Sequence, residues 1–218
     1  MKVKRRIGEV AERLEHARVV GIVRLADART VVAACTEAVA RGLRAVEVPS
    51  TVPGAGRAIS ELRSQLEGTV LVGAGTIRTR AQLEEAIAAG AEFLVAPGLN
   101  PELVEATAAA GLLFLPGVYT ASEVDRALGL GLRFLKLFPA EPAGPGYLAA
   151  LLQPFPEARF VPTGGIGPGN AAAFLRAGAV ALGMGSSIFP PKLIAAEGLQ
   201  VVRGLVDEAM AAVGRGEG

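Results

Sequence analysis

The chain has 218 residues, 51% hydrophobic and 20% charged, a composition that excludes disorder and suits one folded domain over residues 1–218. Its 22 basic and 21 acidic residues leave a net charge of +1, and no basic run is longer than residues 2–6. This balance gives no electrostatic footprint for nucleic acid and favours a small molecule as the partner.

Short apolar runs rich in β-branched residues recur along the chain, and each is followed by a segment with helical spacing. The predicted strands are residues 19–25, 45–50, 70–76, 93–98, 112–118, 134–140, 160–165 and 180–186. The helices between them include residues 27–42, 79–90, 101–111, 122–131 and 168–178, most of which end at a glycine. This alternation indicates a parallel β-sheet.

The number of strand–helix units predicts the architecture. Eight units in about 200 residues suit a closed (β/α)8 TIM barrel better than an open doubly wound sheet. The segment before residue 17 predicts an extra N-terminal helix across the barrel bottom, and residues 198–213 predict the eighth helix, followed by a frayed tail at 214–218. In such barrels the functional residues lie at the C-terminal ends of the strands.

Cysteine and histidine are too scarce for several kinds of chemistry. Cys35 lies in an apolar helical stretch and is interpreted as a packing thiol. His16 is the only histidine, which argues against Ser-His-Asp or Cys-His catalysis and against a zinc site. We expect no metal and no other cofactor. No apolar signal segment or membrane-length apolar stretch is visible, which predicts a cytoplasmic protein without a membrane partner.

The predicted strand ends form a polar ring with one acid and one lysine. Its members are Arg24, Glu47, Thr76, Pro97, Gly117, Tyr119, Thr120, Lys136, Gly164, Gly165 and Ser186.

Lys136 is the one lysine of four that falls in a predicted strand. Burial inside a barrel removes water from the ammonium and favours the neutral amine, which can attack a carbonyl and form a Schiff base. Two structural alternatives remain: a lysine that extends to solvent, or an ion pair with Glu47 that only stabilises the barrel. In the functional interpretation, Glu47 moves protons beside the amine.

Glycines at the last two strand ends suggest an anion site. Gly164 and Gly165 end the seventh strand, and Ser186 ends the eighth. Glycine lets backbone N–H groups approach an anion, and these two loops are the favoured phosphate site of the barrel fold. The alternative is that the glycines only form tight turns.

Motifs spread over nearly the whole chain carry a family resemblance. They are VEV around Glu47, VGAGT ending at Thr76, APG at 96–98, PGV at 116–118, FLKLFPAE around Lys136, PTGGI at 162–166 and GSS at 185–187. Together they resemble the 2-keto-3-deoxy-6-phosphogluconate (KDPG) aldolases, a family that in many organisms also cleaves 4-hydroxy-2-oxoglutarate (KHG). The resemblance implies a metal-independent class I aldolase, a lyase of the Entner-Doudoroff pathway, that forms homotrimers.

The resemblance also implies residue roles. Lys136 would form the Schiff base with pyruvate or the keto acid, and Glu47 would be the general acid and base. Thr76 would hold the keto-acid carboxylate together with the backbone around Phe138, and Pro97 would belong to the same substrate pocket.

The same resemblance implies how the rest of a phosphorylated keto acid is held. Gly164, Gly165 and Ser186 would bind the distal phosphate, and Thr163 would face the substrate hydroxyls. A threonine at this position accompanies the gluconate-derived substrate in the family, whereas galactonate-type relatives tend to have valine.

One position departs from the gluconate-type pattern. Thr51 stands where that type usually has an arginine that helps to bind the carboxylate. Arg24 resembles an arginine of the galactonate type and could supply the guanidinium from across the ring. The pattern therefore leaves the epimer open, with the galactonate-derived substrate as the alternative.

Two further functions are compatible with these residues. One is a phosphate-binding barrel synthase or isomerase of the thiamine-phosphate synthase type, in which Lys136 acts only as a charge. The other is a barrel that binds a sugar phosphate without catalysis.

Overall fold

Helices and short strands alternate along the chain as the apolar periodicity predicts. The computed structural model describes residues 2–214. Its strands are β1 Val19–Ile22, β2 Ala45–Pro49, β3 Leu71–Gly75, β4 Phe93–Val95, β5 Leu113–Leu115, β6 Gly117–Val118, β7 Phe134–Leu137, β8 Arg159–Pro162 and β9 Leu182–Met184. Its helices are α1 Lys2–Ala17, α2 Ala28–Ala40, α3 Ala55–Gln65, α4 Arg80–Ala88, α5 Pro101–Ala110, α6 Ala121–Gly129, α7 Gly144–Leu152, α8 Pro168–Arg176, α9 Pro191–Glu197 and α10 Val201–Val213.

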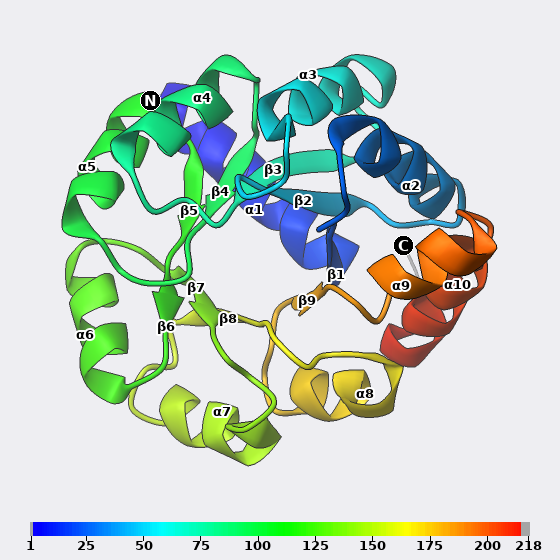
Figure 1. Cartoon of the computed structure of the whole chain (residues 1–218). Coiled ribbons are helices and arrows are strands. Elements are labelled where there is room, and N and C mark those ends of the chain that lie inside the picture. Colours follow the sequence, from blue (N-terminus) through cyan, green and yellow to red (C-terminus); the bar gives the residue numbers. More distant parts are fainter. Residues whose placement is uncertain (1, 215–218) are drawn as a thin grey trace.

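The strands close into a parallel barrel. One sheet has the order β5-β4-β3-β2-β1-β9 and the other β6-β7-β8. A parallel bridge between Thr163 and Gly183, with a hydrogen bond from the Val180 amide to the Phe160 carbonyl (3.0 Å), joins β8 to β9. Figure 1 shows the resulting ring of strands with helices around it. The predicted (β/α)8 barrel with an extra N-terminal helix is confirmed.

Most observed strands are shorter than the predicted ones, and at two of them a proline lies at the point of difference. The predicted strand 112–118 is divided into β5 and β6 at Pro116, which has no N–H to donate to a neighbouring strand. Its carbonyl still accepts a hydrogen bond from the Lys136 amide (2.9 Å). The predicted strand 134–140 ends at Leu137, just before the Phe138–Pro139 bond, which is cis.

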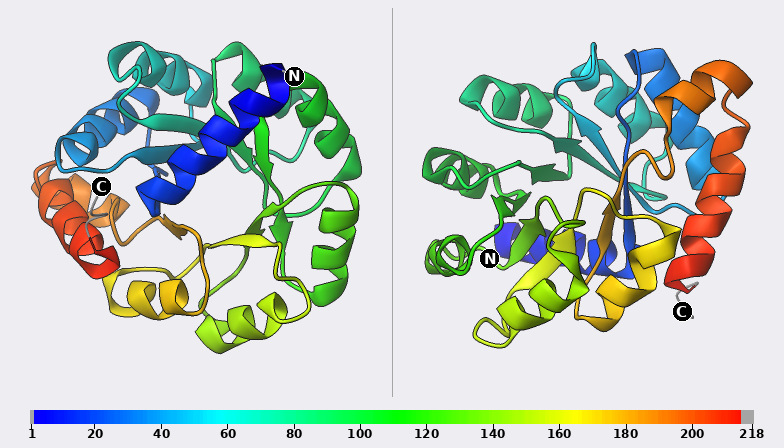
Figure 2. Two further views of the ribbon diagram at one scale, coloured as in Figure 1. Left: turned by 180° about the vertical axis from the view of Figure 1, so that it is seen from behind. Right: turned by 60° about the horizontal axis from the view of Figure 1, so that its bottom comes forward.

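Helix α1 covers the N-terminal end of the barrel, as expected, and Figure 2 shows it crossing the ring from behind. Its buried residues Val10, Leu14 and Ala17 belong to one apolar cluster with side chains from the barrel interior. Glu15 binds Arg159 of β8 through two hydrogen bonds of 2.9 and 2.7 Å. The helix is therefore part of the barrel core rather than an appendage.

The C-terminal helical region is divided in two. The predicted helix 198–213 begins only at Val201, and the short helix α9 precedes it, which the sequence analysis did not predict. Gly198 separates the two with a φ of 87°, a left-handed value that favours glycine. The predicted frayed tail lies outside the described residues from 215 onward.

A buried carboxylate fastens α1 and α3 to the sheet. Glu92, which is 8% exposed, lies just before β4 and accepts a hydrogen bond from the Val72 amide (3.0 Å). It also pairs with Arg13 of α1 at 3.3 Å and with Arg63 of α3 at 2.6 Å. One side chain thus joins three elements at the N-terminal end of the barrel.

We expect Glu92→Ala to lower the free energy of unfolding by about 2–3 kcal/mol, because it leaves a buried amide and two arginines without their acceptor. Urea denaturation measures this. The matched control is Glu84→Ala, which removes an exposed pair with Arg80 and should change stability by less than about 0.5 kcal/mol. Equal effects of the two substitutions would contradict this role for Glu92.

Candidate active site

Strand alternation places three polar side chains inside the barrel. Successive side chains of a strand point to opposite faces, so residues two apart share a face. Ala45, Phe134 and Val161 contribute to the interior apolar cluster at the α1 end. Two residues further along the same strands come Glu47, Lys136 and Thr163, which are 3%, 7% and 6% exposed. These three therefore form the next interior layer toward the C-terminal end.

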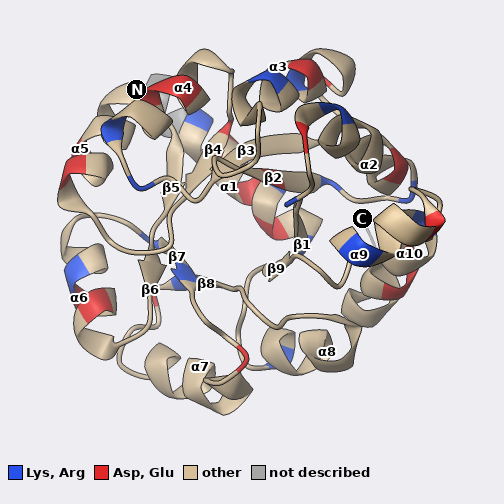
Figure 3. Ribbon diagram, viewed as in Figure 1, with Lys and Arg blue, Asp and Glu red and all other residues tan. Residues whose placement is uncertain are grey.

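Charge of this kind is uncommon in the barrel wall. Figure 3 shows that most charged residues lie on the surrounding helices, while the strands are largely uncharged. Glu47 and Lys136 are therefore exceptions to this distribution of charge, and their burial in the strands requires an explanation.

Glu47 is held in a nearly dry position in the middle of β2. It is paired with Ile22 of β1 on one side and with Gly73 of β3 on the other. Burial raises the pKa of its carboxyl, and the positive charges of Lys136 and Arg24 oppose that rise. A carboxyl in this setting exchanges a proton more readily near neutral pH than an exposed glutamate does.

The Glu47 carboxyl occupies space that only glycine leaves free. A Cβ added to Gly75 would lie 1.8 Å from Glu47 Oε1 and 2.4 Å from its Cδ. The glycine at the end of β3 therefore permits the carboxyl to lie against the backbone.

We expect Gly75→Ala to lower kcat by at least about tenfold, because the added methyl group would displace Glu47 or shift β3. Steady-state kinetics of the catalysed reaction measures the loss. Gly8→Ala in α1 is the matched control, since a Cβ there would meet nothing within 4 Å. Unchanged activity in Gly75→Ala would show that the position of this carboxyl does not matter.

Lys136 lies on the opposite side of the ring, on β7. Its neighbours across the sheet are Gly117 on β6 and Val161 on β8. The ammonium lies 4.8 Å from the centroid of the Phe138 ring. At 7% exposure the side chain is not one that extends into solvent. Among the ion pairs of the described residues none joins Lys136 to Glu47, so their charges interact across a gap rather than as a contact pair.

The predicted phosphate loops present unused hydrogen-bond donors. Gly164 and Gly165 have φ values of 91° and 75°, a left-handed succession that glycine adopts without strain. Within residues 2–214, no hydrogen bond is found for the backbone N–H groups of Gly165, Ile166, Ser186 and Ser187. Consecutive free amides of this kind form an anion-binding concavity.

These loops are fixed by side chains outside the predicted set. Asn170 of α8 accepts from the Gly167 amide (3.0 Å) and donates to the Gly165 carbonyl (2.9 Å). The Ser187 hydroxyl donates to the Ile166 carbonyl (2.9 Å), while Ser186 is exposed. Neither Asn170 nor Ser187 was predicted from the sequence as a site residue, although the segments at 167–170 and 185–187 contain them.

The remaining predicted residues are distributed along the same rim. Thr76 directly follows β3 with a φ of 58°, and its carbonyl accepts from the Ser50 hydroxyl (3.0 Å). Arg24 is exposed beyond β1, and Pro97 is exposed beyond β4. Arg24 acts on the site electrostatically, since it lowers the pKa of Glu47.

Tyr119 and Thr120 have structural partners. Thr120 caps α6 and shares a capping box with Glu123. Tyr119 stacks on Tyr147 with ring centroids 5.4 Å apart and accepts that residue's hydroxyl proton at its carbonyl (2.7 Å). Thr120 therefore caps a helix, a role that its position near a predicted strand end did not reveal.

A closed barrel in which one lysine of the described residues is buried inside, opposite a buried carboxyl, is typical of the lysine-dependent, class I aldolases. A family model described as KDPG and KHG aldolase matches residues 10–205. The chain belongs to the KDPG and KHG aldolase family.

Individual relatives agree with this assignment. The chain is 36% identical over 206 residues to a 2-dehydro-3-deoxy-phosphogluconate aldolase of Treponema pallidum, covering 94% of this chain and 98% of the relative. A KDPG aldolase structure from Legionella pneumophila, with pyruvate captured as a covalent carbinolamine, matches with a TM-score of 0.82 at 30% identity, over 88% and 93% of the two chains. A KDPG aldolase from Zymomonas mobilis with 3-phosphoglycerate matches with a TM-score of 0.84 at 31% identity, over 94% and 96%.

The family resemblance and the aldolase class predicted from the sequence are thus confirmed. No helix in the described part of the chain has the length and apolarity that a membrane crossing needs. The same residues contain no group of three or more acidic, histidine or cysteine side chains arranged to hold a metal ion.

Proposed function

We propose that this aldolase cleaves KDPG to pyruvate and glyceraldehyde 3-phosphate through a Schiff base on Lys136, and that it also cleaves KHG to pyruvate and glyoxylate. The burial of Lys136 in the barrel wall, opposite a buried carboxyl, is the observation that carries the proposal. The covalent pyruvate adduct of the Legionella enzyme supports it.

The geometry supports a complete sequence of steps. The neutral amine of Lys136 attacks the C2 carbonyl and gives a carbinolamine, which loses water to form an iminium ion. Glu47 removes the proton of the C4 hydroxyl, the C3–C4 bond breaks, and its electron pair passes into the iminium to form an enamine. The aldehyde leaves, the enamine takes a proton at C3, and water releases pyruvate and the free amine.

Residues around the rim hold the substrate in this proposal. Thr76, the backbone at Phe138 and Arg24 bind the carboxylate, and Pro97 shapes the pocket beside them. The free amides at Gly165 and Ser186 support binding of the distal phosphate there, together with Gly164. The 3-phosphoglycerate in the Zymomonas structure is a further reason to assign a phosphorylated substrate.

Thr163 leads us to propose the gluconate-derived epimer as the preferred substrate. Its side chain is 6% exposed in the interior layer, and its hydroxyl donates to the Val161 carbonyl at 3.2 Å. Arg24 favours the galactonate-derived epimer as the second candidate. Comparison of kcat/KM for the two epimers and for KHG decides among them, and comparable values for the two epimers would contradict the preference.

The rival synthase function makes a different experimental prediction. A metal-dependent synthase or isomerase of the thiamine-phosphate type would lose activity in EDTA, whereas the proposed aldolase releases pyruvate at an unchanged rate. A barrel without catalytic activity would bind the phosphorylated keto acid and release none.

We also propose that the protein is a cytoplasmic homotrimer, as the family resemblance implies. Light scattering coupled to size-exclusion chromatography measures the mass, and cell fractionation measures the location. A monomer at micromolar concentration would contradict the trimer.

A further inference from the structure

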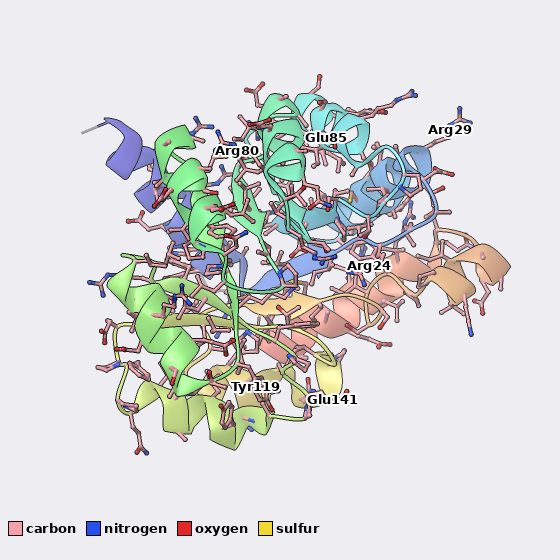
Figure 4. All side chains as sticks on the ribbon, turned by 60° about the vertical axis from the view of Figure 1, so that its left-hand side comes forward. Arg24, Arg29, Arg80, Glu85, Tyr119 and Glu141 are labelled. Carbon is pink, nitrogen blue, oxygen red and sulfur yellow. The ribbon has the colours of Figure 1, made fainter. Side chains whose placement is uncertain are left out.

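A carboxylate lies beside the proposed phosphate loop. Glu141 follows β7, and its backbone N–H donates to the Gly164 carbonyl at 3.0 Å. Its side chain lies on Gly165, where an added Cβ would come within 2.3 Å of Glu141 Cβ and 2.4 Å of Oε2. Figure 4 places Glu141 and Tyr119 in the same half of the barrel and Arg24 in the other half.

This carboxylate has no cation to neutralise it. Within residues 2–214, no ion pair or side-chain hydrogen bond is found for Glu141, and the residue is exposed. The Gly165 amide beside it is one of the free donors described above. A fixed negative charge therefore lies at the edge of a site that is otherwise built for an anion.

We propose that Glu141 determines specificity by weakening the binding of the doubly charged phosphate end relative to a substrate that has no phosphate. This inference rests on the proposed function, because it assigns the loop of Gly164 and Gly165 to the distal phosphate. Repulsion between the carboxylate and a phosphate dianion opposes the free amides, while KHG extends a smaller group toward this loop. The same charge reduces the difference in binding affinity between KDPG and KHG, and it promotes release of the phosphorylated aldehyde.

The test is the isosteric substitution Glu141→Gln, which removes the charge and keeps the shape that lies on Gly165. We expect KM for KDPG to fall about fivefold, whereas KM for KHG changes by less than about twofold. The inhibition constant of inorganic phosphate should fall by a similar factor.

Ionic strength separates electrostatics from loop structure. The difference in KM between the wild type and Glu141→Gln should shrink at about 0.5 M salt, because an exposed charge is screened. The matched control is Glu157→Gln, which removes a charge that is also exposed, from the connection between α7 and β8 at the other end of the barrel. Its ratio of the two KM values should equal that of the wild type.

The outcomes are distinguishable. The inference about Glu141 alone is overturned if the wild type cleaves both substrates and Glu141→Gln either leaves the ratio of KM for KDPG to KM for KHG unchanged or raises both KM values. A wild-type protein that releases no pyruvate from KDPG would overturn the proposed function as well.

Discussion

Replacement of Lys136 by Ala is expected to reduce pyruvate release from KDPG by at least about 10⁴-fold, because no other group can form the covalent intermediate. Lys136 is the interior lysine of the barrel, whereas Lys2 and Lys4 lie near the N-terminus and Lys192 lies in α9. A coupled assay for pyruvate measures the loss. Lys136→Arg should be as inactive as Lys136→Ala, because an arginine keeps the charge but has no nucleophilic amine at neutral pH.

The matched control is Lys192→Ala, which removes an exposed lysine of α9 and should retain full activity. Lys136→Ala should remain folded, since it removes a contact with the Phe138 ring that is worth about 1–2 kcal/mol. Circular dichroism and thermal unfolding verify this. More than about one per cent of wild-type turnover in a folded Lys136→Ala protein would contradict the covalent mechanism.

Glu47→Gln is expected to lower kcat by about 10²- to 10⁴-fold, because the amide keeps the shape of the side chain but cannot move a proton. Formation of the pyruvate adduct should be slowed, and cleavage of the C3–C4 bond should be slowed more. Single-turnover kinetics separates these two steps. The half-buried Glu61 of α3 offers a control, since Glu61→Gln leaves the barrel interior unchanged.

The same substitution has an effect on stability with a defined sign. Burial raises the pKa of Glu47 in the folded state above its ordinary value, so folding binds a proton that the unfolded chain releases. The wild type therefore loses stability as the pH rises from about 5 through the folded-state pKa, and Glu47→Gln does not. Urea denaturation from pH 4 to 8 should find the two proteins most similar at the acidic end. A difference that is largest at pH 4 would contradict the assigned cause.

Much of the barrel was predictable because local patterns determine it. Apolar runs predicted all eight strand positions, and helical spacing with glycine caps predicted most of the helices between them, although α3 and α7 were not named individually. A buried Lys136 was one of the alternatives that its place in an apolar strand left open. The division of the fifth strand depends on Pro116 lacking an N–H, a signal that was visible in the sequence. The short helix α9 was missed because Gly198 ends it after only seven residues.

The candidate site was predictable only as far as single residues carry unusual chemistry. A lysine in an apolar strand and a pair of glycines stand out without a structure. The contact of Glu47 with Gly75 and that of Glu141 with Gly165 join residues far apart in the chain, so only the folded barrel reveals them. Thr120 looks like a site residue by position, and its capping box becomes apparent only with helix α6 in place.

The most direct test of the account is reduction with borohydride in the presence of pyruvate, followed by peptide mass mapping. An iminium on Lys136 would be reduced to a stable secondary amine, so we expect one modified peptide, containing residues 134–141, with the added mass at Lys136. Lys136→Ala and incubation without pyruvate should give no modified peptide. Absence of any adduct in the wild type, or an adduct on Lys192 instead, would contradict the Schiff-base mechanism.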